Sequence, residues 1–200
     1  FKFKLGKIYS LMGPSGSGKS TLLNIISLID RPTSGSIKFQ NNLIDFKNSE
    51  KNDLFRANNI GIVHQQDNLL PDFNALENVY LACLAAGNEK EKAINKAINI
   101  LKKVGLSKRL EHYPNELSGG EKQRVSISRA LINEPNIILA DEPTGSLDRK
   151  TSLEIFNLLK KQINHKRLII FATHNRFFAN KSDCILEMVD GNIKSTNVRV

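Results

Sequence analysis

The chain has 200 residues, of which 40% are apolar and 24% charged, and 29 basic against 20 acidic side chains give it a net charge of +9. These values exclude a disordered chain and are typical of one globular domain, or of a core with a small subdomain. The longest uninterrupted apolar run, residues 79–86, is far shorter than the roughly 18 residues that suggest a membrane-spanning helix.

The positive charge has three explanations: nucleic-acid binding, attraction to an anionic membrane surface, or lysines on solvated helix faces. The lysines are spread along the sequence rather than clustered, which favours solvated faces. Cys83 and Cys184 fit no metal or redox spacing, and we expect both to be reduced thiols of a cytosolic protein.

The first third of the chain alternates strand and helix patterns. Residues 1–5 alternate apolar and polar like a half-buried strand already under way, and because the chain starts with Phe1 we expect part of the domain to precede it. Residues 41–59 form a polar segment in which the pattern allows a short helix around Leu54. Around it we predict a buried strand, a helix and two short strands, at residues 8–12, 19–29, 36–39 and 60–63.

From residue 68 to about 115 the pattern becomes helical. One helix face collects apolar residues with lysines between them: Ala93, Ile94, Ala97, Ile98, Leu101 and Val104. The block shows almost no alternating β-branched residues. We therefore predict an inserted helical subdomain, residues 68–133, within a nucleotide core formed by residues 1–67 and 134–200.

Strand patterns return in the last third of the chain, at residues 137–140, 168–173 and 185–189. An amphipathic helix separates the first two, with Leu153, Phe156, Leu159 and Ile163 on its apolar face. Strands that alternate with helices imply parallel βαβ crossovers, so the sequence predicts an α/β fold with a parallel sheet. The absence of an internal repeat indicates a single core.

The segment between the first strand and the first helix has the pattern G-x-x-x-x-G-K-[ST] of a phosphate-binding loop. Its residues are Gly13, Pro14, Ser15, Gly16, Ser17, Gly18, Lys19, Ser20 and Thr21. Glycines let backbone N–H groups curl around phosphate oxygens, and the helix that follows points its positive end at the same anion. Lys19 supplies charge toward the β- and γ-phosphates, and the Ser20 hydroxyl can bind Mg²⁺. This loop predicts a nucleotide site.

Two acids end the strand at residues 137–140, and Pro143 stops that strand directly after them. Beside a phosphate loop, Asp141 is expected to reach the Mg²⁺ shell, while Glu142 orients and polarises a water molecule for attack on the γ-phosphate. His174 follows another apolar strand and is expected at the same edge of the sheet, as a sensor of the γ-phosphate. Gln65 follows a third strand. Its carbonyl oxygen can bind Mg²⁺ and its amide can contact water, so we expect it to take part in catalysis.

Residues 117–121 form a second glycine-containing segment, Leu117-Ser118-Gly119-Gly120-Glu121, which we call the signature segment. Ser118 can cap the helix that follows, and the exposed N–H groups at the helix start offer a second anion site. The two anion sites cannot easily serve one ATP because the helical block intervenes. Two facing copies of the chain would solve this geometry, each phosphate loop opposing the other copy's signature segment.

With the phosphate loop, Gln65, the signature segment, the acid pair and His174 in this order, the chain resembles ATP-binding-cassette (ABC) ATPases over its whole length. The resemblance implies a P-loop NTPase core of the RecA-like type with the ABC helical subdomain, ATP and Mg²⁺ as ligands, and hydrolysis in a homodimer. Ser118, Gly119 and Gly120 would then contact the γ-phosphate of an ATP bound to the other subunit. Ser146, Leu147 and Asp148 would form the loop that crosses the dimer interface, and Asp148 would take part in binding the nucleotide.

The resemblance also implies partners and a location. Residues 68–79 would lie near the groove for an integral membrane transporter subunit, and the protein would sit peripherally on the cytoplasmic face of the bacterial inner membrane, without a nucleic-acid partner. The amino-acid sequence of residues 68–79, 117–121 and 139–145 is similar to that of the lipoprotein-releasing subgroup. Two related readings stay open: a macrolide-type efflux ATPase, and a cell-division ATPase that acts as a mechanical regulator. The interval between Lys19 and Ser118 is too short for the coiled coil of chromosome-maintenance ATPases.

Overall fold

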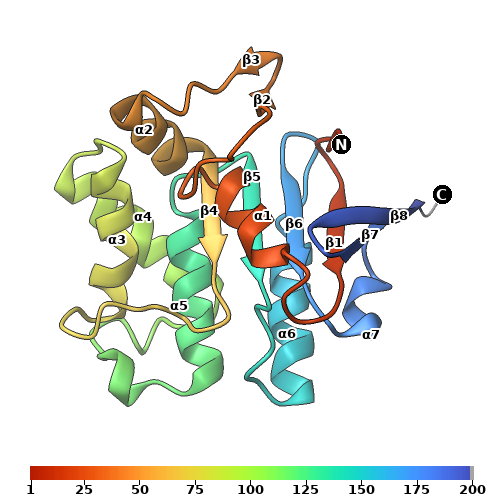
Figure 1. The fold of residues 1–200 in the computed structure, drawn as a ribbon. Helices are drawn as coiled ribbons and strands as arrows, with labels where there is room; N and C mark the ends of the chain where they lie inside the picture. The colour runs from red at the N-terminus through yellow and green to blue at the C-terminus, as the bar shows by residue number, and fades with distance from the viewer. Residues whose placement is uncertain (199–200) are drawn as a thin grey trace.

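A six-stranded sheet forms the centre of the protein in a computed structural model that describes residues 1–198 (Figure 1). The strand order is β4-β5-β6-β1-β7-β8, in which the first five strands run parallel and β8 pairs antiparallel to β7. The strands are β1 (Ile8–Met12), β4 (Ile60–Val63), β5 (Ile137–Asp141), β6 (Leu168–Ala172), β7 (Cys184–Val189) and β8 (Asn192–Val198). The predicted α/β fold with a parallel sheet is confirmed.

The central strands are largely apolar because helices cover both faces of the sheet. Along β5, Ile138 belongs to one core cluster while Ile137 and Leu139 belong to the other, as the alternation of side chains across a strand requires. The first cluster contains side chains of α6 (Arg149–Lys160), and the second contains Leu23 of α1 (Lys19–Ile26). A core on each face fixes the register of the strands, and with it the ends from which the site is built.

A small region precedes β4 in the chain. It contains the two-stranded hairpin of β2 (Lys38–Phe39) and β3 (Asn42–Leu43), followed by α2 (Ser49–Asn59). The Phe39 ring packs edge-on against Phe55 of α2, with 5.1 Å between ring centroids. The helix predicted around Leu54 is therefore present, while the strand predicted at residues 36–39 is shorter than expected.

The predicted helical block contains α3 (Ala75–Ala85), α4 (Lys90–Lys103) and a short 3₁₀ helix (Pro114–Glu116). These pack with α5 (Gly119–Leu131) around a third cluster that includes Ala93, Ala97 and Leu101, the buried residues of the apolar stripe of α4. Helix α5 also contributes to the sheet core, because Ile127 packs there while Val125 packs in the helical cluster. None of the helices among residues 1–198 is long and apolar enough to span a membrane.

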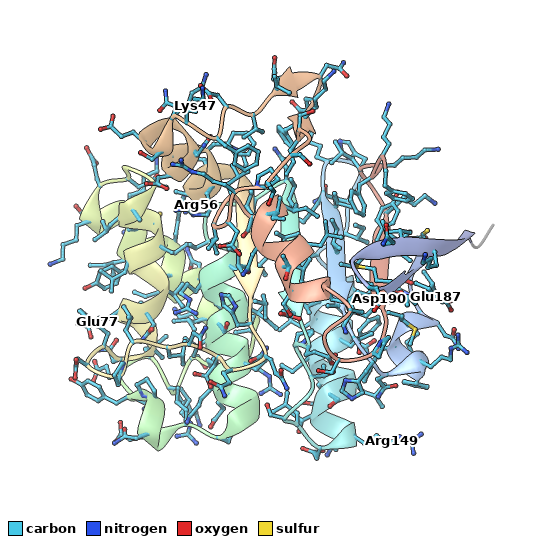
Figure 2. The ribbon with its side chains drawn as sticks, in the orientation of Figure 1. Lys47, Arg56, Glu77, Arg149, Glu187 and Asp190 are labelled. Atoms are coloured by element: carbon cyan, nitrogen blue, oxygen red, sulfur yellow. The ribbon has the colours of Figure 1, made fainter. Side chains whose placement is uncertain are left out.

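Charged side chains are distributed over the whole molecule (Figure 2). Lys47 before α2, Arg149 at the start of α6 and Asp190 in the β7–β8 turn are all exposed and lie far apart on the surface. This distribution agrees with the interpretation of the net positive charge as solvated surface.

The strand predicted at residues 1–5 is wrong. Strand β1 already pairs with β6 on one side and β7 on the other, which leaves no edge of β1 for this segment to join. Its apolar residues serve another purpose, because the rings of Phe1 and Phe3 pack edge-on against Tyr9. The helix predicted at residues 19–29 ends early, at Ile26, since Leu28 adopts a left-handed φ of 62° that cannot continue a helix.

Candidate functional site

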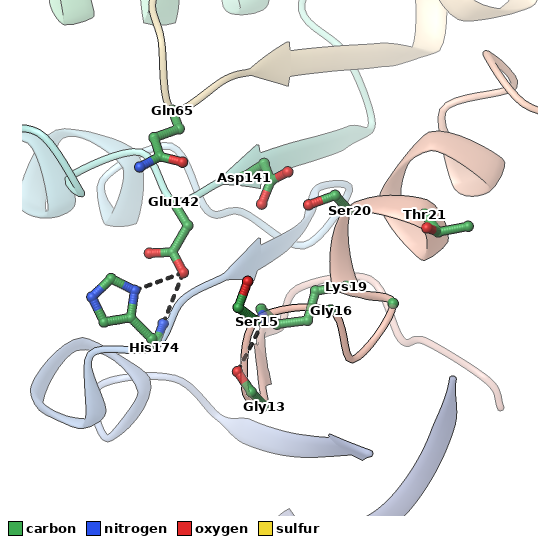
Figure 3. Close-up of a pocket in the computed structure, with 11 residues that line it drawn as sticks. Gly13, Ser15, Gly16, Lys19, Ser20, Thr21, Gln65, Asp141, Glu142 and His174 are labelled. Carbon is green, nitrogen blue, oxygen red and sulfur yellow. Dashed lines mark hydrogen bonds and ion pairs between the residues drawn. The ribbon is translucent and has the colours of Figure 1, made fainter. Parts of the chain in front are cut away.

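Four parallel strands deliver polar side chains to one edge of the sheet. There they line a cleft of about 480 Å³ with the phosphate loop (Figure 3). The residues that line it are Gly13, Ser15, Gly16, Gly18, Lys19, Ser20, Thr21, Gln65, Asp141, Glu142 and His174. Carboxyl ends of parallel strands are where open α/β sheets bind ligands. The structure therefore brings the predicted phosphate loop, acid pair, glutamine and histidine into a single site.

The phosphate loop is tightly built between β1 and α1. A Cβ on Gly13 would lie 2.3 Å from the Met188 carbonyl oxygen, so no side chain fits at that position. Lys19 is buried, and its Nζ donates hydrogen bonds of 2.9 Å to the carbonyl oxygens of Gly13 and Pro14 (Figure 3). A charged phosphate oxygen is a stronger acceptor than either carbonyl. The ammonium group is thus positioned to pair with a bound phosphate.

The two acids differ in how the backbone holds them. Asp141 is the last residue of β5, whereas Glu142 adopts a left-handed φ of 45°, which is unfavourable for a residue with a side chain. The Glu142 N–H donates to the carbonyl oxygen of Ala172 at the end of β6, over 3.0 Å. This bond to the neighbouring strand keeps the turn in place, and the turn directs both carboxylates into the cleft (Figure 3).

Glu142 and His174 form a specific pair. One oxygen of Glu142, Oε1, accepts hydrogen bonds from the His174 backbone N–H at 3.0 Å and from ring Nδ1 at 2.9 Å (Figure 3). Because an ionised carboxylate can only accept, Nδ1 carries the proton in this arrangement. The Glu142 side chain is 15% exposed and His174 72% exposed. A largely shielded carboxylate is therefore oriented by a histidine at the mouth of the site.

Gln65 lies on the loop that leaves β4, residues 64–68, which we call the Gln65 loop. Its amide is close to the turn after Glu142, because a Cβ on Gly145 would lie 3.0 Å from Gln65 Nε2. Two side chains of α5 hold the loop by its carbonyl oxygens. Gln123 Nε2 donates to His64 over 3.2 Å, and the Arg129 guanidinium donates to Asp67 and Asn68, each over 2.8 Å.

Sequence reasoning missed both of these α5 residues. Burial lowers the pKa of Arg129, and the pKa of His64 is lowered by its own burial and then by the charge of Arg129. The two helix residues lie about 60 positions from their partners. A helical pattern predicts which face of α5 is buried, but it does not predict which loop that face contacts.

The signature segment lies outside the cleft of its own chain, and none of Ser118, Gly119 and Gly120 lines the cleft. Ser118 caps α5, since its Oγ accepts from the Glu121 N–H while its own N–H donates to Glu121 Oε2. Arg109 Nε completes the cluster with a 2.8 Å bond to Glu121 Oε1. The hydrogen bond from Arg109 is the main cause that lowers the pKa of Glu121 to about 2, and the bond from the Ser118 N–H is the next largest.

Asp148 also lies outside the cleft, at the start of α6. Its carboxylate accepts from the backbone N–H groups of Lys150 and Thr151, at 2.9 and 3.1 Å, and from the Thr151 hydroxyl at 2.5 Å. The bond from the Thr151 hydroxyl, with the backbone bond from the same residue, lowers the pKa of Asp148. Within one chain, this predicted ligand-binding residue is a helix cap.

Known proteins resemble this chain over most of its length. The ABC transporter family matches residues 1–145. The lipoprotein-releasing system ATP-binding protein LolD of Rickettsia bellii is 47% identical over 187 residues, covering 93% of this chain and 82% of that protein. LolD of Ehrlichia ruminantium is 46% identical over 196 residues, covering 97% and 86% of the two chains.

Solved structures share the whole fold. The ATP-binding cassette MJ0796, seen as a dimer in a post-hydrolysis state bound to ADP and Pi, is 39% identical with a TM-score of 0.90, covering 99% of this chain and 88% of its own. The cassette cbiO1 of Clostridium perfringens is 30% identical with a TM-score of 0.86, covering 99% and 79%. The parallel sheet and phosphate loop are those of the P-loop NTPase fold. The chain therefore belongs to the ABC transporter family, as an ATPase of the LolD-like subgroup.

Proposed function

We propose that this ATPase works as a homodimer on the cytoplasmic face of the bacterial inner membrane, where it drives a membrane partner that releases lipoproteins. The proposal of a homodimer rests on the position of the signature segment. Ser118 and Gly119 are exposed residues at the start of α5, yet the segment from Ser118 to Gly120 lies outside the cleft of its own chain. A second copy facing the first would bring each signature segment to the other chain's nucleotide.

The residues of the cleft suit Mg²⁺ bound together with ATP. Ser20 offers a hydroxyl, Asp141 a carboxylate and Gln65 an amide carbonyl, and Mg²⁺ in nucleotide sites combines a few such oxygens with phosphate oxygens. When bound, the ion neutralises charge that develops on the transferred phosphoryl group. Lys19 adds a fixed positive charge beside the same phosphates.

Glu142 is the proposed base for hydrolysis. Its carboxylate lines the cleft, and the two bonds from His174 fix its orientation before a water molecule arrives. Glu142 accepts a proton as the water oxygen bonds to the γ-phosphorus in line with the β–γ bridge, whose P–O bond breaks to leave ADP and phosphate. Fixing the base in advance lowers the reorganisation that the reaction requires.

The proposal of a lipoprotein substrate rests on the relatives, whose names describe a lipoprotein-releasing system. The test is to purify the full-length protein together with its native membrane subunits, and to reconstitute them in liposomes that carry a bacterial lipoprotein. We expect ATP-dependent release of that lipoprotein, which a Glu142→Gln complex does not perform. Export of a macrolide, or stimulated ATP hydrolysis without any release, would instead identify an efflux ATPase or a mechanical regulator.

A further inference from the structure

The first turn of α5 packs against the first turn of α6 in the same chain, with Gly120 facing Thr151. A Cβ built on Gly120 would lie 2.6 Å from the Cγ2 methyl carbon of Thr151, well inside the distance that two carbon atoms allow. Neighbouring Gly119 is less confined, since its Cβ would meet Leu147 Cδ2 at 3.3 Å and does not approach Thr151. Within its own chain, the second glycine of the signature segment has no room for a side chain.

The Thr151 methyl group cannot simply rotate away. Its hydroxyl donates to Asp148 Oδ2, and its backbone N–H donates to Asp148 Oδ1. Because Cβ carries both the methyl and the hydroxyl, a new χ1 rotamer that moved the methyl would also remove the hydroxyl from Asp148. The cap at the start of α6 therefore holds the methyl group against Gly120.

We infer that Thr151 is a positioning residue that fixes the signature segment to the loop at residues 146–148 within one chain. The inference rests on the proposed homodimer, in which these two segments belong to the interface with the other subunit. Joined through Thr151, the start of α5 and the start of α6 approach the other subunit's nucleotide as one rigid unit. Packing within its own chain then requires a glycine at position 120, in addition to any requirement set by an approaching phosphate.

The test is a double-mutant cycle on the full-length protein with Gly120→Ala, Thr151→Ser and the double variant. Serine keeps the hydroxyl that caps α6 and deletes only the methyl. We expect Gly120→Ala to lower kcat at least about tenfold, since overpacking displaces the signature segment, with the KM for ATP unchanged. The double variant should recover kcat to within about threefold of Thr151→Ser alone. The melting temperature should fall in Gly120→Ala and recover in the double variant.

Two matched controls isolate the methyl group. Thr151→Val keeps a methyl and loses the hydroxyl, so Gly120→Ala combined with Thr151→Val should stay slow. Gly119→Ala does not approach Thr151, so Thr151→Ser should not rescue it.

Three results would overturn the inference: a Gly120→Ala enzyme with normal kcat, a double variant as slow as Gly120→Ala, or recovery of melting temperature without recovery of kcat. The second would place the need for glycine at the other subunit's nucleotide, and the third would leave Thr151 a purely structural residue. Failure of the proposed function can be distinguished from failure of this inference. A wild-type protein that stays monomeric with ATP contradicts the homodimer. The melting temperatures of the variants still report the Gly120–Thr151 contact in that case.

Discussion

His174 donates two hydrogen bonds to a single oxygen of Glu142, one from its backbone at 3.0 Å and one from its ring at 2.9 Å. The backbone bond persists whatever side chain stands at position 174, whereas the ring bond depends on histidine. Removing the ring therefore leaves the carboxylate in the cleft, held by one hydrogen bond in place of two and less tightly oriented.

His174→Ala should accordingly lower kcat by about 10- to 100-fold and leave the KM for ATP nearly unchanged, because orientation of the base matters only in the chemical step. Steady-state ATPase assays of the full-length protein measure both constants. His165→Ala, on an exposed turn away from the cleft, is the matched control and should keep the wild-type rate. A rise in KM with an unchanged kcat would show that His174 serves binding instead.

Arg129 should hold the Gln65 loop in position through its bonds to the loop's carbonyl oxygens. Arg129→Met deletes both donors to the carbonyl oxygens of Asp67 and Asn68, at a cost of about 1.5 to 3 kcal/mol for charge-assisted bonds. We expect a lower free energy of unfolding in urea and a higher Mg²⁺ concentration for half-maximal ATPase activity, since Gln65, a proposed ligand of the ion, is no longer held in place. Arg129→Lys, which can replace one of the two bonds, should show a smaller change in both measurements. An unchanged Mg²⁺ requirement would separate Arg129 from the function of the loop.

The ion pair of Arg109 and Glu121 should make stability depend on pH. The pKa of Glu121 falls from 4.5 to about 2 on folding, so the charged carboxylate stabilises the folded state above pH 4.5, and this stabilisation is lost as the pH drops from 4.5 toward 2. Arg109 is 44% exposed, so solvent screening reduces the gain to about 1 kcal/mol. Glu121→Gln should be less stable than wild type by about this amount at pH 7.

Urea unfolding of both proteins between pH 7 and pH 3 measures this difference. It should shrink as the pH falls through the interval between the two pKa values. The exposed Glu111 supplies the control, since Glu111→Gln should change stability little at any pH. A difference between wild type and Glu121→Gln that stays constant down to pH 3 would contradict an ionised, paired Glu121.

The role proposed for Ser118 is tested with a large and a small side chain at that position. Ser118→Arg places a long cationic side chain where the other subunit's nucleotide would approach, and it should abolish turnover while ATP binding to the monomer changes little. Ser118→Ala removes the hydroxyl that caps α5, at about 1 kcal/mol of stability, without adding bulk or charge, and should retain measurable turnover. Nucleotide titration of the monomer and ATPase assays report the two properties separately. Equal loss of both in Ser118→Arg would mean that the signature segment serves its own chain's fold.

Much of the site could be predicted from sequence because its residues follow apolar strands. Gln65, Asp141 and His174 each come at or just after such a strand, and parallel strands end at the same edge of the sheet. The phosphate loop is a local pattern with its own geometry. These features need no knowledge of distant contacts, and for this reason the cleft contains most of the phosphate loop together with Gln65, the acid pair and His174, though not the signature segment or Asp148.

Other parts of the structure depend on contacts that one sequence does not reveal. Residues 1–5 have the alternation of a strand, yet the neighbouring positions in the sheet are already occupied. Strand β8, which is largely polar, forms because β7 offers it a free edge. The contacts of Arg129 with the Gln65 loop and of Thr151 with Gly120 join segments that lie far apart in the sequence, and hydrophobic periodicity carries no information about them.

Dimerisation on ATP is the central claim, and the mass of the Glu142→Gln protein in solution tests it most directly. With its base removed, the full-length protein should hydrolyse ATP at least about 100-fold more slowly and should retain the nucleotide between its two copies. Size-exclusion chromatography with light scattering should then give a dimer with Mg²⁺ and ATP, and a monomer without nucleotide. A Glu142→Gln protein that binds ATP and remains monomeric would contradict the two-sided site.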